Sequence, residues 1–246
     1  IAQILNKDRF IELLYDYIVY DAGVKKLCRP HQYFGVKAAQ QNVAEQQGGI
    51  IWHTQGSGKS LTMVWLARWI LENVEDGRVL IVTDREELDS QIESVFQGVG
   101  ESIYRTSSGS HLIEALAGTL NVTNYPSAPS LICSLVHKFG STTDTDAITD
   151  EIVSKLPAGF KPTGNFVVFV DEAHRTQSGD LHDAMKKVLP NATFIGFTGT
   201  PLLSADKARS VETFGPYIHT YKYDEAVTDG VVLDLRYEAR DIDQRI

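Results

Sequence analysis

Short continuous apolar runs alternate along the chain with longer segments in which apolar side chains recur at helical spacing. The runs that are typical of strands buried on both faces are residues 49–52, 78–83, 131–136, 166–170 and 192–197. The segment from Lys59 to about Asn73 is apolar on nearly every side, which indicates a buried helix. Buried strands that alternate with helices predict an α/β fold with a mostly parallel sheet and helices on both faces.

Weaker patterns predict the remaining elements. Phe10, Leu13, Leu14, Tyr17 and Ile18 recur at helical spacing, so we expect an amphipathic helix over residues 8–20. Further helices are expected over residues 35–47, 86–96, 112–117 and 180–189 and near residue 152, and a further strand near residue 103.

The turn between the first apolar run and the long helix carries the clearest candidate chemistry. It reads His-Thr-Gln-Gly-Ser-Gly-Lys-Ser over residues 53–60. Backbone N–H groups and the dipole at a helix start favour an anion, and glycines let the backbone approach a phosphate. The loop residues Gln55, Gly56, Ser57 and Gly58 would therefore cradle the phosphates of a nucleotide.

The two residues after Gly58 extend this chemistry. Lys59 would contact the β- and γ-phosphates, and the Ser60 hydroxyl would bind Mg²⁺. The phosphate-loop pattern begins with a glycine, and His53 stands at that position here. A chance Gly-Lys-Ser triplet is the alternative, but the strand before it and the helix after it are the context that the motif requires.

Two adjacent carboxylates, Asp171 and Glu172, directly follow the most apolar run of the chain. They could form a solvated turn. Beside a phosphate loop we favour a catalytic interpretation, in which Asp171 holds Mg²⁺ directly or through water and Glu172 polarises the attacking water. Lys59, Asp171 and Glu172 are thus the candidate catalytic residues, for hydrolysis rather than for phosphorylation of another acceptor.

Several polar segments share one expected location. In parallel sheets the functional residues lie at the carboxyl ends of the strands. The segments that follow an apolar run in this chain are residues 53–60, 84–85, 171–174 and 198–200. We therefore expect them to meet at one edge of the sheet.

Composition limits the partners and the compartment. With 246 residues, 43% of them hydrophobic and 22% charged, the chain resembles an ordinary globular protein. Its net charge of −9 gives no overall basic field, so any DNA contact must come from a local patch. Cys28 and Cys133 are far apart, and we expect buried free thiols in a reducing cytoplasm. No apolar run reaches the roughly 18–20 residues needed to span a bilayer. The first residue is Ile1 rather than Met, so we expect the chain to be a piece of a longer polypeptide.

The motifs resemble those of a known family. Residues 171–174 form a DEAH box, and Thr-Gly-Thr-Pro at residues 198–201 resembles the third motif of superfamily 2 helicases and translocases. Residues 52–60, 84–89, 171–177 and 197–201 resemble, in order and spacing, motifs of the motor subunit of type I restriction enzymes. RNA helicases with this box usually carry a Ser-Ala-Thr third motif, which is absent here.

The resemblance covers roughly residues 8–240 and implies a RecA-like motor domain that moves along double-stranded DNA with ATP and Mg²⁺. It also implies roles for single residues. These are Arg29 and Gln32 in an adenine-reading Q motif, His174, Thr198 and Thr200 in coupling nucleotide state to DNA, and Asp84, Arg85, Ser134 and Lys138 near the DNA path.

The resemblance further implies a division of the chain: an N-terminal helical segment with the Q motif over residues 1–47, a first RecA-like domain over 48–216, and a connector over 217–246. A second RecA-like domain with an arginine finger and a nuclease domain of the PD-(D/E)xK fold would belong to the same full-length chain. Methylation and specificity subunits would be its partners. Two alternatives stay open: an RNA helicase or another superfamily 2 DNA remodeller, and a nucleotide-dependent scaffold that does not hydrolyse.

Overall fold

The structure is a computed structural model. It describes residues 6–83, 86–123, 126–135, 156, 158–173, 182, 185–200 and 210–234, with only the backbone for residues 86–91 and 135. The helix expected near residue 152 lies outside these residues.

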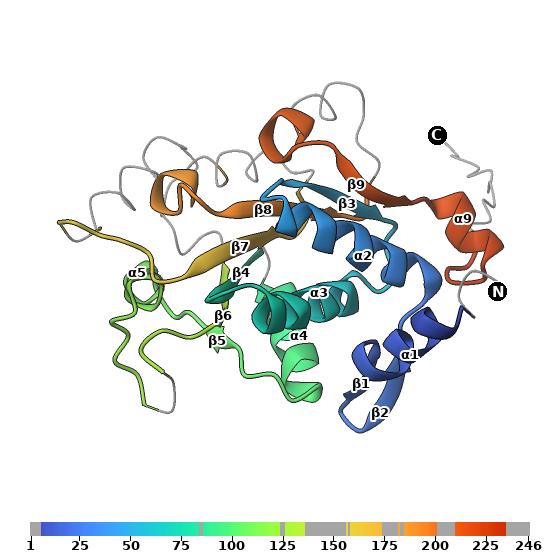
Figure 1. Ribbon diagram of the computed structural model, residues 1–246, viewed down its shortest axis with the longest axis horizontal. Coiled ribbons are helices and arrows are strands. Elements are labelled where there is room, and N and C mark those ends of the chain that lie inside the picture. Colours follow the sequence, from blue (N-terminus) through green and yellow to red (C-terminus); the bar gives the residue numbers. More distant parts are fainter. Residues whose placement is uncertain are drawn as a thin grey trace, which may run out of the picture.

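A parallel sheet forms the centre of the molecule (Figure 1). Its strands are β3 (Gly49–His53), β4 (Gly77–Thr83), β5 (Tyr104–Arg105), β6 (Leu131–Leu135), β7 (Asn165–Val170), β8 (Thr193–Thr198) and β9 (Tyr217–Tyr221). In the described residues the order is β5-β6-β4-β7-β8-β3-β9, and every pairing is parallel. The predicted parallel α/β sheet is confirmed, and all its strands end at the same edge.

Helices pack on both faces of this sheet, as predicted. On one face, α2 (Pro30–Ala44), α3 (Lys59–Asn73) and α4 (Glu86–Gly98) share a core with alternate strand residues such as Ile51. On the other face, α5 (Gly109–Ala117) and residues 185–189 share a core with the intervening strand residues such as Ile50. This alternation is the two-residue period of a strand buried on both sides.

The α3 helix anchors the turn that precedes it. Its side chains from Thr62 to Ala67 and Ile70 are all buried, and Val64 and Leu66 have no exposed area. Full burial of an aliphatic side chain of this size contributes about 1.5–3 kcal/mol. The start of α3, at Lys59, is therefore fixed on the sheet by the packing of the helix body.

The N-terminal segment differs from the prediction. The first helix, α1 (Lys7–Asp16), ends before Tyr17, and β1 (Ile18–Asp21) pairs with β2 (Val24–Leu27) as an antiparallel hairpin. The helix expected through residue 20 was therefore wrong. Ala22 and Gly23 both have positive φ, 48° and 82°, which is the geometry of a tight two-residue hairpin turn.

The C-terminal part of the sheet contains a strand that was not predicted from the sequence. Residues 217–221, which the sequence reading assigned to a connector, form β9 and pair in parallel with β3. A short helix, α9 (Tyr223–Thr228), follows directly. The strand β9 thus lies beside the strand that leads into the Gly-x-Gly-Lys-Ser turn.

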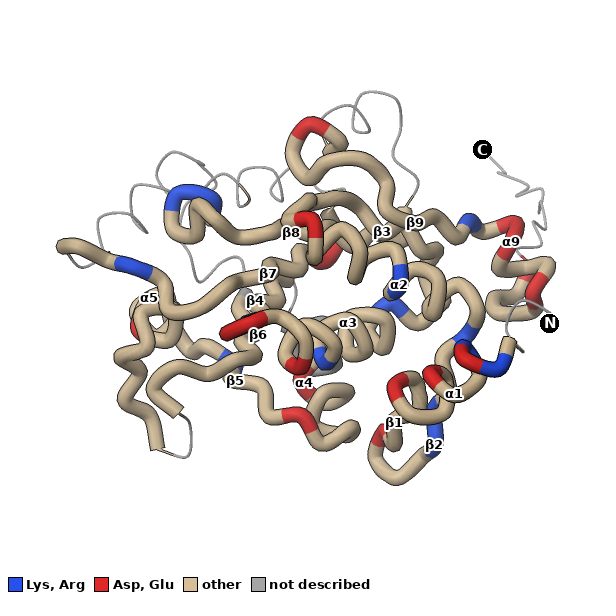
Figure 2. The backbone as a smooth tube through the Cα atoms, viewed as in Figure 1, with Lys and Arg blue, Asp and Glu red and all other residues tan. Residues whose placement is uncertain are grey.

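The distribution of charged residues and the burial of the two cysteines agree with what the composition indicated. Figure 2 shows basic and acidic residues interspersed along the described chain. Cys28 and Cys133 are both free thiols and both buried, as predicted. Within the ranges that the structure describes, each helix is too short or too polar to pass through a bilayer.

Candidate nucleotide site

The turn between β3 and α3 has the geometry of a phosphate cradle. Gly56 and Gly58 have φ values of 80° and 89°, in the left-handed region that favours glycine. The Ser57 hydroxyl donates to the Thr54 carbonyl at 2.6 Å and closes the turn. Gln55 and Gly56 are exposed, whereas Lys59 is half-buried, so the outer side of the loop is open to a ligand beside the helix start.

The α2 helix holds this loop from behind. The Gln32 amide donates to the Gly58 carbonyl at 2.9 Å, and its oxygen accepts from the Arg29 N–H at 2.8 Å. Gln32 is only 3% exposed, while Arg29 is exposed. The structure thus brings Gln32 to the phosphate loop, where its amide supports loop carbonyls. Contact of Arg29 and Gln32 with an adenine stays a prediction.

The carboxylates Asp171 and Glu172 lie in a turn after β7 that is fixed at both ends. The Asp171 N–H donates to the Val82 carbonyl of β4, and the Ala173 N–H donates to the Phe197 carbonyl of β8, each at 2.9 Å. Glu172 has a φ of 51°, which is unfavourable for a residue with a side chain. Strained backbone of this kind concentrates at functional sites, and here the neighbouring strands impose it.

The segment after β8 lies between these carboxylates and the loop, because β8 is placed between β7 and β3. The Thr198 hydroxyl accepts from the Thr200 N–H at 3.2 Å, and Thr198 is fully buried. Gly199 approaches the loop so closely that an added Cβ would lie 2.7 Å from the Lys59 Nζ. The predicted coupling residues Thr198 and Thr200 therefore flank the point where this segment meets Lys59.

The candidate metal ligands are chemically suited to Mg²⁺. Ser60 offers a hydroxyl in the first turn of α3, and Asp171, 8% exposed, offers a carboxylate at the end of β7. Mg²⁺ prefers oxygen ligands and commonly takes only one or two from the protein, with water and phosphate supplying the rest. The pair fits that pattern.

The predicted DNA-contacting residues are less informative. Ser134 is 1% exposed, and its hydroxyl accepts from the Thr106 hydroxyl at 2.8 Å inside the fold. This burial argues against a direct contact of the Ser134 side chain with DNA. The remaining predicted residues lie outside the described residues; these are Asp84, Arg85 and Lys138 near the DNA path and the coupling residue His174.

The sequence reading missed a group of aromatic rings beneath the loop. His53 Nε2 and His219 Nδ1 are hydrogen-bonded at 2.9 Å, and the His31 ring stacks on Tyr221 with centroids 3.8 Å apart. Burial, followed by the nearby His219, His31 and Lys59, lowers the pKa of His53 to about 2, so its ring is neutral at physiological pH. The only signal in the sequence was the histidine that replaces the leading glycine of the motif.

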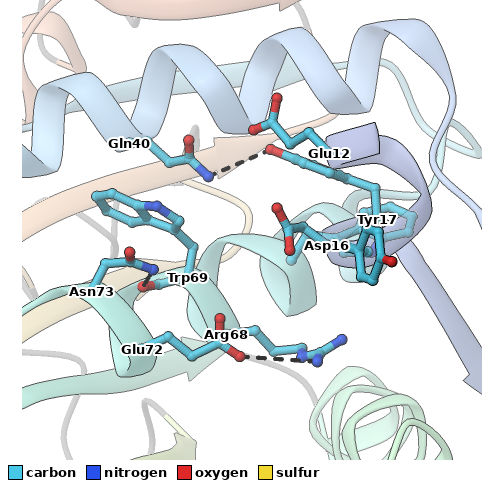
Figure 3. Close-up of a pocket in the computed structure, with 10 residues that line it drawn as sticks. Glu12, Asp16, Tyr17, Gln40, Arg68, Trp69, Glu72 and Asn73 are labelled. Atoms are coloured by element: carbon cyan, nitrogen blue, oxygen red, sulfur yellow. Dashed lines mark hydrogen bonds and ion pairs between the residues drawn. The ribbon is translucent and has the colours of Figure 1, made fainter. Parts of the chain in front are cut away.

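A separate cavity of about 290 Å³ lies among α1, α2 and α3 (Figure 3). In it the Gln40 amide points to the Tyr17 hydroxyl at 3.4 Å, and burial raises the pKa of that hydroxyl. Trp69 and Glu72 of the distal part of α3 also line it. None of the predicted nucleotide-binding or catalytic residues line this cavity, so the candidate site remains the open side of the phosphate loop.

The phosphate loop, the turn that carries Asp171 and Glu172, and the parallel sheet agree with the family that a sequence comparison identifies. The sequence model of the SWI2/SNF2 ATPase family matches residues 31–246, and the chain belongs to that family.

Comparison with individual proteins is more specific. The chain is 32% identical over 252 residues to the "Putative type I restriction enzyme MjaIXP endonuclease subunit" of Methanocaldococcus jannaschii, covering 96% of this chain and 22% of the relative. It is 32% identical over 236 residues to the "Type I restriction enzyme HindI endonuclease subunit" of Haemophilus influenzae, covering 87% and 21%. The resemblance drawn from the motifs is thereby confirmed, and the chain spans about a fifth of the length of these relatives.

A solved structure supports the fold. A nuclease-deletion mutant of the Type ISP restriction-modification enzyme LlaGI, in complex with a DNA substrate mimic, is similar with a TM-score of 0.60 and 16% identity. The match covers 84% of this chain and 21% of that chain. The fold is therefore that of a RecA-like domain, as expected from the sequence.

Proposed function

We propose that this chain is the ATP-binding and ATP-hydrolysing half of the DNA translocase motor in a type I restriction endonuclease subunit. The observation that carries the proposal is the strand order β7-β8-β3, which brings the Asp171–Glu172 turn, the Thr198–Thr200 segment and the phosphate loop to one edge of the sheet. Relatives that are type I restriction endonuclease subunits support the choice of motor.

Each residue has a defined task in this proposal. The loop N–H groups and Lys59 hold the phosphates, and Ser60 and Asp171 bind Mg²⁺, which neutralises charge that develops on the phosphoryl oxygens. Glu172 orients water for in-line attack and accepts its proton. Thr198, Thr200 and His174 couple the nucleotide-bound state of the site to DNA binding.

The partners in the proposal follow from the relatives. Double-stranded DNA is the track, and Asp84, Arg85 and Lys138 are proposed to lie near it. A second RecA-like domain and a nuclease domain belong to the same full-length polypeptide in this proposal, as the greater length of the relatives supports. Methylation and specificity subunits of a type I restriction complex are the proposed protein partners. Two buried free cysteines support a location in the reducing cytoplasm.

Steady-state ATPase measurements test the proposal. We expect residues 1–246 to bind ATP but to turn it over slowly, because an arginine finger from a second domain contributes about 10³–10⁵ in rate in related hydrolases. The full-length polypeptide should hydrolyse ATP faster when duplex DNA is added. Rapid turnover by residues 1–246 that duplex DNA stimulates as in the full-length polypeptide would contradict the half-motor assignment.

The same assay separates the two alternatives. Stimulation of the full-length polypeptide by RNA rather than by duplex DNA would favour an RNA helicase. ATP binding without turnover under any polynucleotide would favour a nucleotide-dependent scaffold in which Glu172 is not a working base.

A further inference from the structure

The phosphate loop is held on its second side by β9, through the residue that departs from the motif. His53 is fully buried and hydrogen-bonds His219 of β9 at 2.9 Å. Its other ring nitrogen, Nδ1, has no hydrogen-bond partner among the described residues, so His219 is its one polar anchor. Room for this pair comes from Gly35 of α2, where an added Cβ would lie 2.9 Å from the His53 ring.

The strand contacts the loop at further points. The Thr54 N–H donates to the Tyr221 carbonyl at 2.9 Å. Tyr221 also stacks on His31, whose Nε2 donates to the Ser57 carbonyl at 3.0 Å. The start and the middle of the loop are thus bonded to β9 either directly or through one ring.

The contact continues past the strand. The Tyr221 hydroxyl donates to the Asp229 carboxylate at 2.8 Å, which links β9 to the end of α9. Beyond α9, Val232 lies over the loop, since a Cβ added at Gly56 would be 3.4 Å from it. The segment 217–232 therefore follows one side of the phosphate loop from its first residue to its exposed glycine.

We propose that His53, His219 and Tyr221 are positioning residues, which fix the phosphate loop for the nucleotide and transmit nucleotide occupancy to β9 and α9. The inference rests on the proposed ATP-binding function and adds a route that leaves the loop on the side opposite to the Thr198–Thr200 segment. In sheet order these two routes follow the two neighbours of β3, which are β8 and β9. A loop that shifts when phosphate binds must shift its bonded partners on β9, because a buried imidazole cannot exchange its partner for water.

The test uses two substitutions at His219, which is half-buried and so more tolerant than His53. His219→Leu removes the hydrogen bond to His53 and fills the position with an apolar side chain. His219→Asn keeps a polar atom close to the position of Nδ1. Thr220→Ala, at the exposed next residue of the same strand, is the matched control.

Two readouts are needed. Affinity is measured by titration with a fluorescent mant-ATP and Mg²⁺, and coupling by amide hydrogen exchange over residues 217–221 and 223–228 with and without a non-hydrolysable ATP analogue. The leucine variant should bind roughly three- to tenfold more weakly, as expected for one lost hydrogen bond. It should also lose the nucleotide-induced protection of both segments, whereas the asparagine variant and the control should keep it.

The outcomes separate a positioning role from a structural one. A leucine variant that is merely less stable, with unchanged affinity and an unchanged exchange response, would overturn the inference. Should that variant fail to fold, Tyr221→Phe keeps the stack on His31 and removes only the bond to Asp229. In this variant the nucleotide should still protect β9 from hydrogen exchange but should no longer protect α9. Unchanged protection of α9 would overturn the proposed transmission from β9 to α9. A wild-type protein that binds no mant-ATP at all would instead overturn the proposed function.

Discussion

The Lys59 ammonium lies against the backbone of Gly199. A Cβ placed on residue 199 would be 2.7 Å from Lys59 Nζ and 3.2 Å from the Gln55 N–H nitrogen. Residue 199 follows β8 and residue 59 begins α3, so this contact joins the third motif to the phosphate loop. The glycine between Thr198 and Thr200 is explained by this space requirement.

We expect Gly199→Ala to weaken ATP binding while the fold stays stable. The end of a lysine side chain can move away from a new methyl group at little cost, so the free energy of unfolding should change by less than about 1 kcal/mol. Lys59 would then no longer point to the phosphates, and affinity should fall roughly tenfold. Calorimetric titration with ATP and Mg²⁺, beside urea unfolding, measures both quantities.

Gly100→Ala is the control for this substitution, with the opposite expected pattern. Its φ of 84° is strained for alanine, yet a new methyl group would meet nothing within 4 Å. It should cost about 1 kcal/mol of stability without an effect on affinity. Equal affinities in the two alanine variants would show that the contact between Gly199 and Lys59 has no role in binding.

Replacement of Lys59 itself should have a larger effect. Lys59→Ala removes a charge-assisted contact to the phosphates, worth about 1.5–3 kcal/mol, so affinity for ATP with Mg²⁺ should fall roughly 10- to 100-fold. Lys37→Ala provides the comparison, since Lys37 is exposed on α2 and pairs with Glu12, away from the phosphate loop. Unchanged calorimetric affinity in a folded Lys59→Ala protein would remove the loop from the nucleotide site.

The two carboxylates after β7 should have different roles. Glu172→Gln, in the full-length polypeptide, should keep ATP affinity and lose about 10²–10⁴ in turnover, because the amide cannot accept a proton. Asp171→Asn should also weaken the Mg²⁺-dependent part of binding, since it removes the charge that attracts the ion. ATPase rates and affinities at several Mg²⁺ concentrations distinguish them, and identical binding defects in both variants would contradict this division.

The site-bearing edge of the sheet could be predicted because its signals are local. Strands β4, β7 and β8 are buried on both faces, so they appear in the sequence as continuous apolar runs. A polar motif directly after such a run must lie at the carboxyl end of a strand. Glu172 and Lys59 were therefore assigned to the same edge from sequence alone.

The elements that were missed lack such signals. In β9 only Tyr221 is buried, because an edge strand with few neighbours needs no apolar run. Tyr17, just before β1, and Ile18, its first residue, continue the apolar spacing of α1 by coincidence, and the hairpin is specified by the short turn at Ala22. The partner of His53 was beyond local reasoning, since His219 lies 166 positions away and no pattern within either segment indicates the pairing.

The histidines beneath the loop predict a loss of stability in mild acid. Burial, as the main cause, lowers the pKa values of His53, His31 and His219. His53 faces His31 from α2, His219 from β9 and Lys59 from the start of α3, and these neighbours lower its pKa further. Glu225 of α9 raises the pKa of His219, but burial outweighs it.

The direction of the effect follows from proton linkage. Below the unfolded pKa of 6.5 the unfolded chain takes up protons on these rings that the folded chain does not, so stability falls as the pH falls. For His53, whose folded pKa is about 2, the loss is on the order of 1 kcal/mol between pH 7.5 and pH 5.5. The other two rings act in the same direction. Ordinary carboxylates titrate near pH 4 and contribute little within this window.

Urea unfolding at pH 7.5, 6.5 and 5.5 measures this dependence. His53→Gln removes the titrating ring but keeps a polar atom near the position of Nε2, so the variant should lose less stability on acidification than the wild type, by on the order of 1 kcal/mol. Thr220→Ala on the neighbouring strand should follow the wild-type curve. Parallel stability curves for the wild type and His53→Gln would mean that His53 binds protons equally in both states and is not held neutral by the fold.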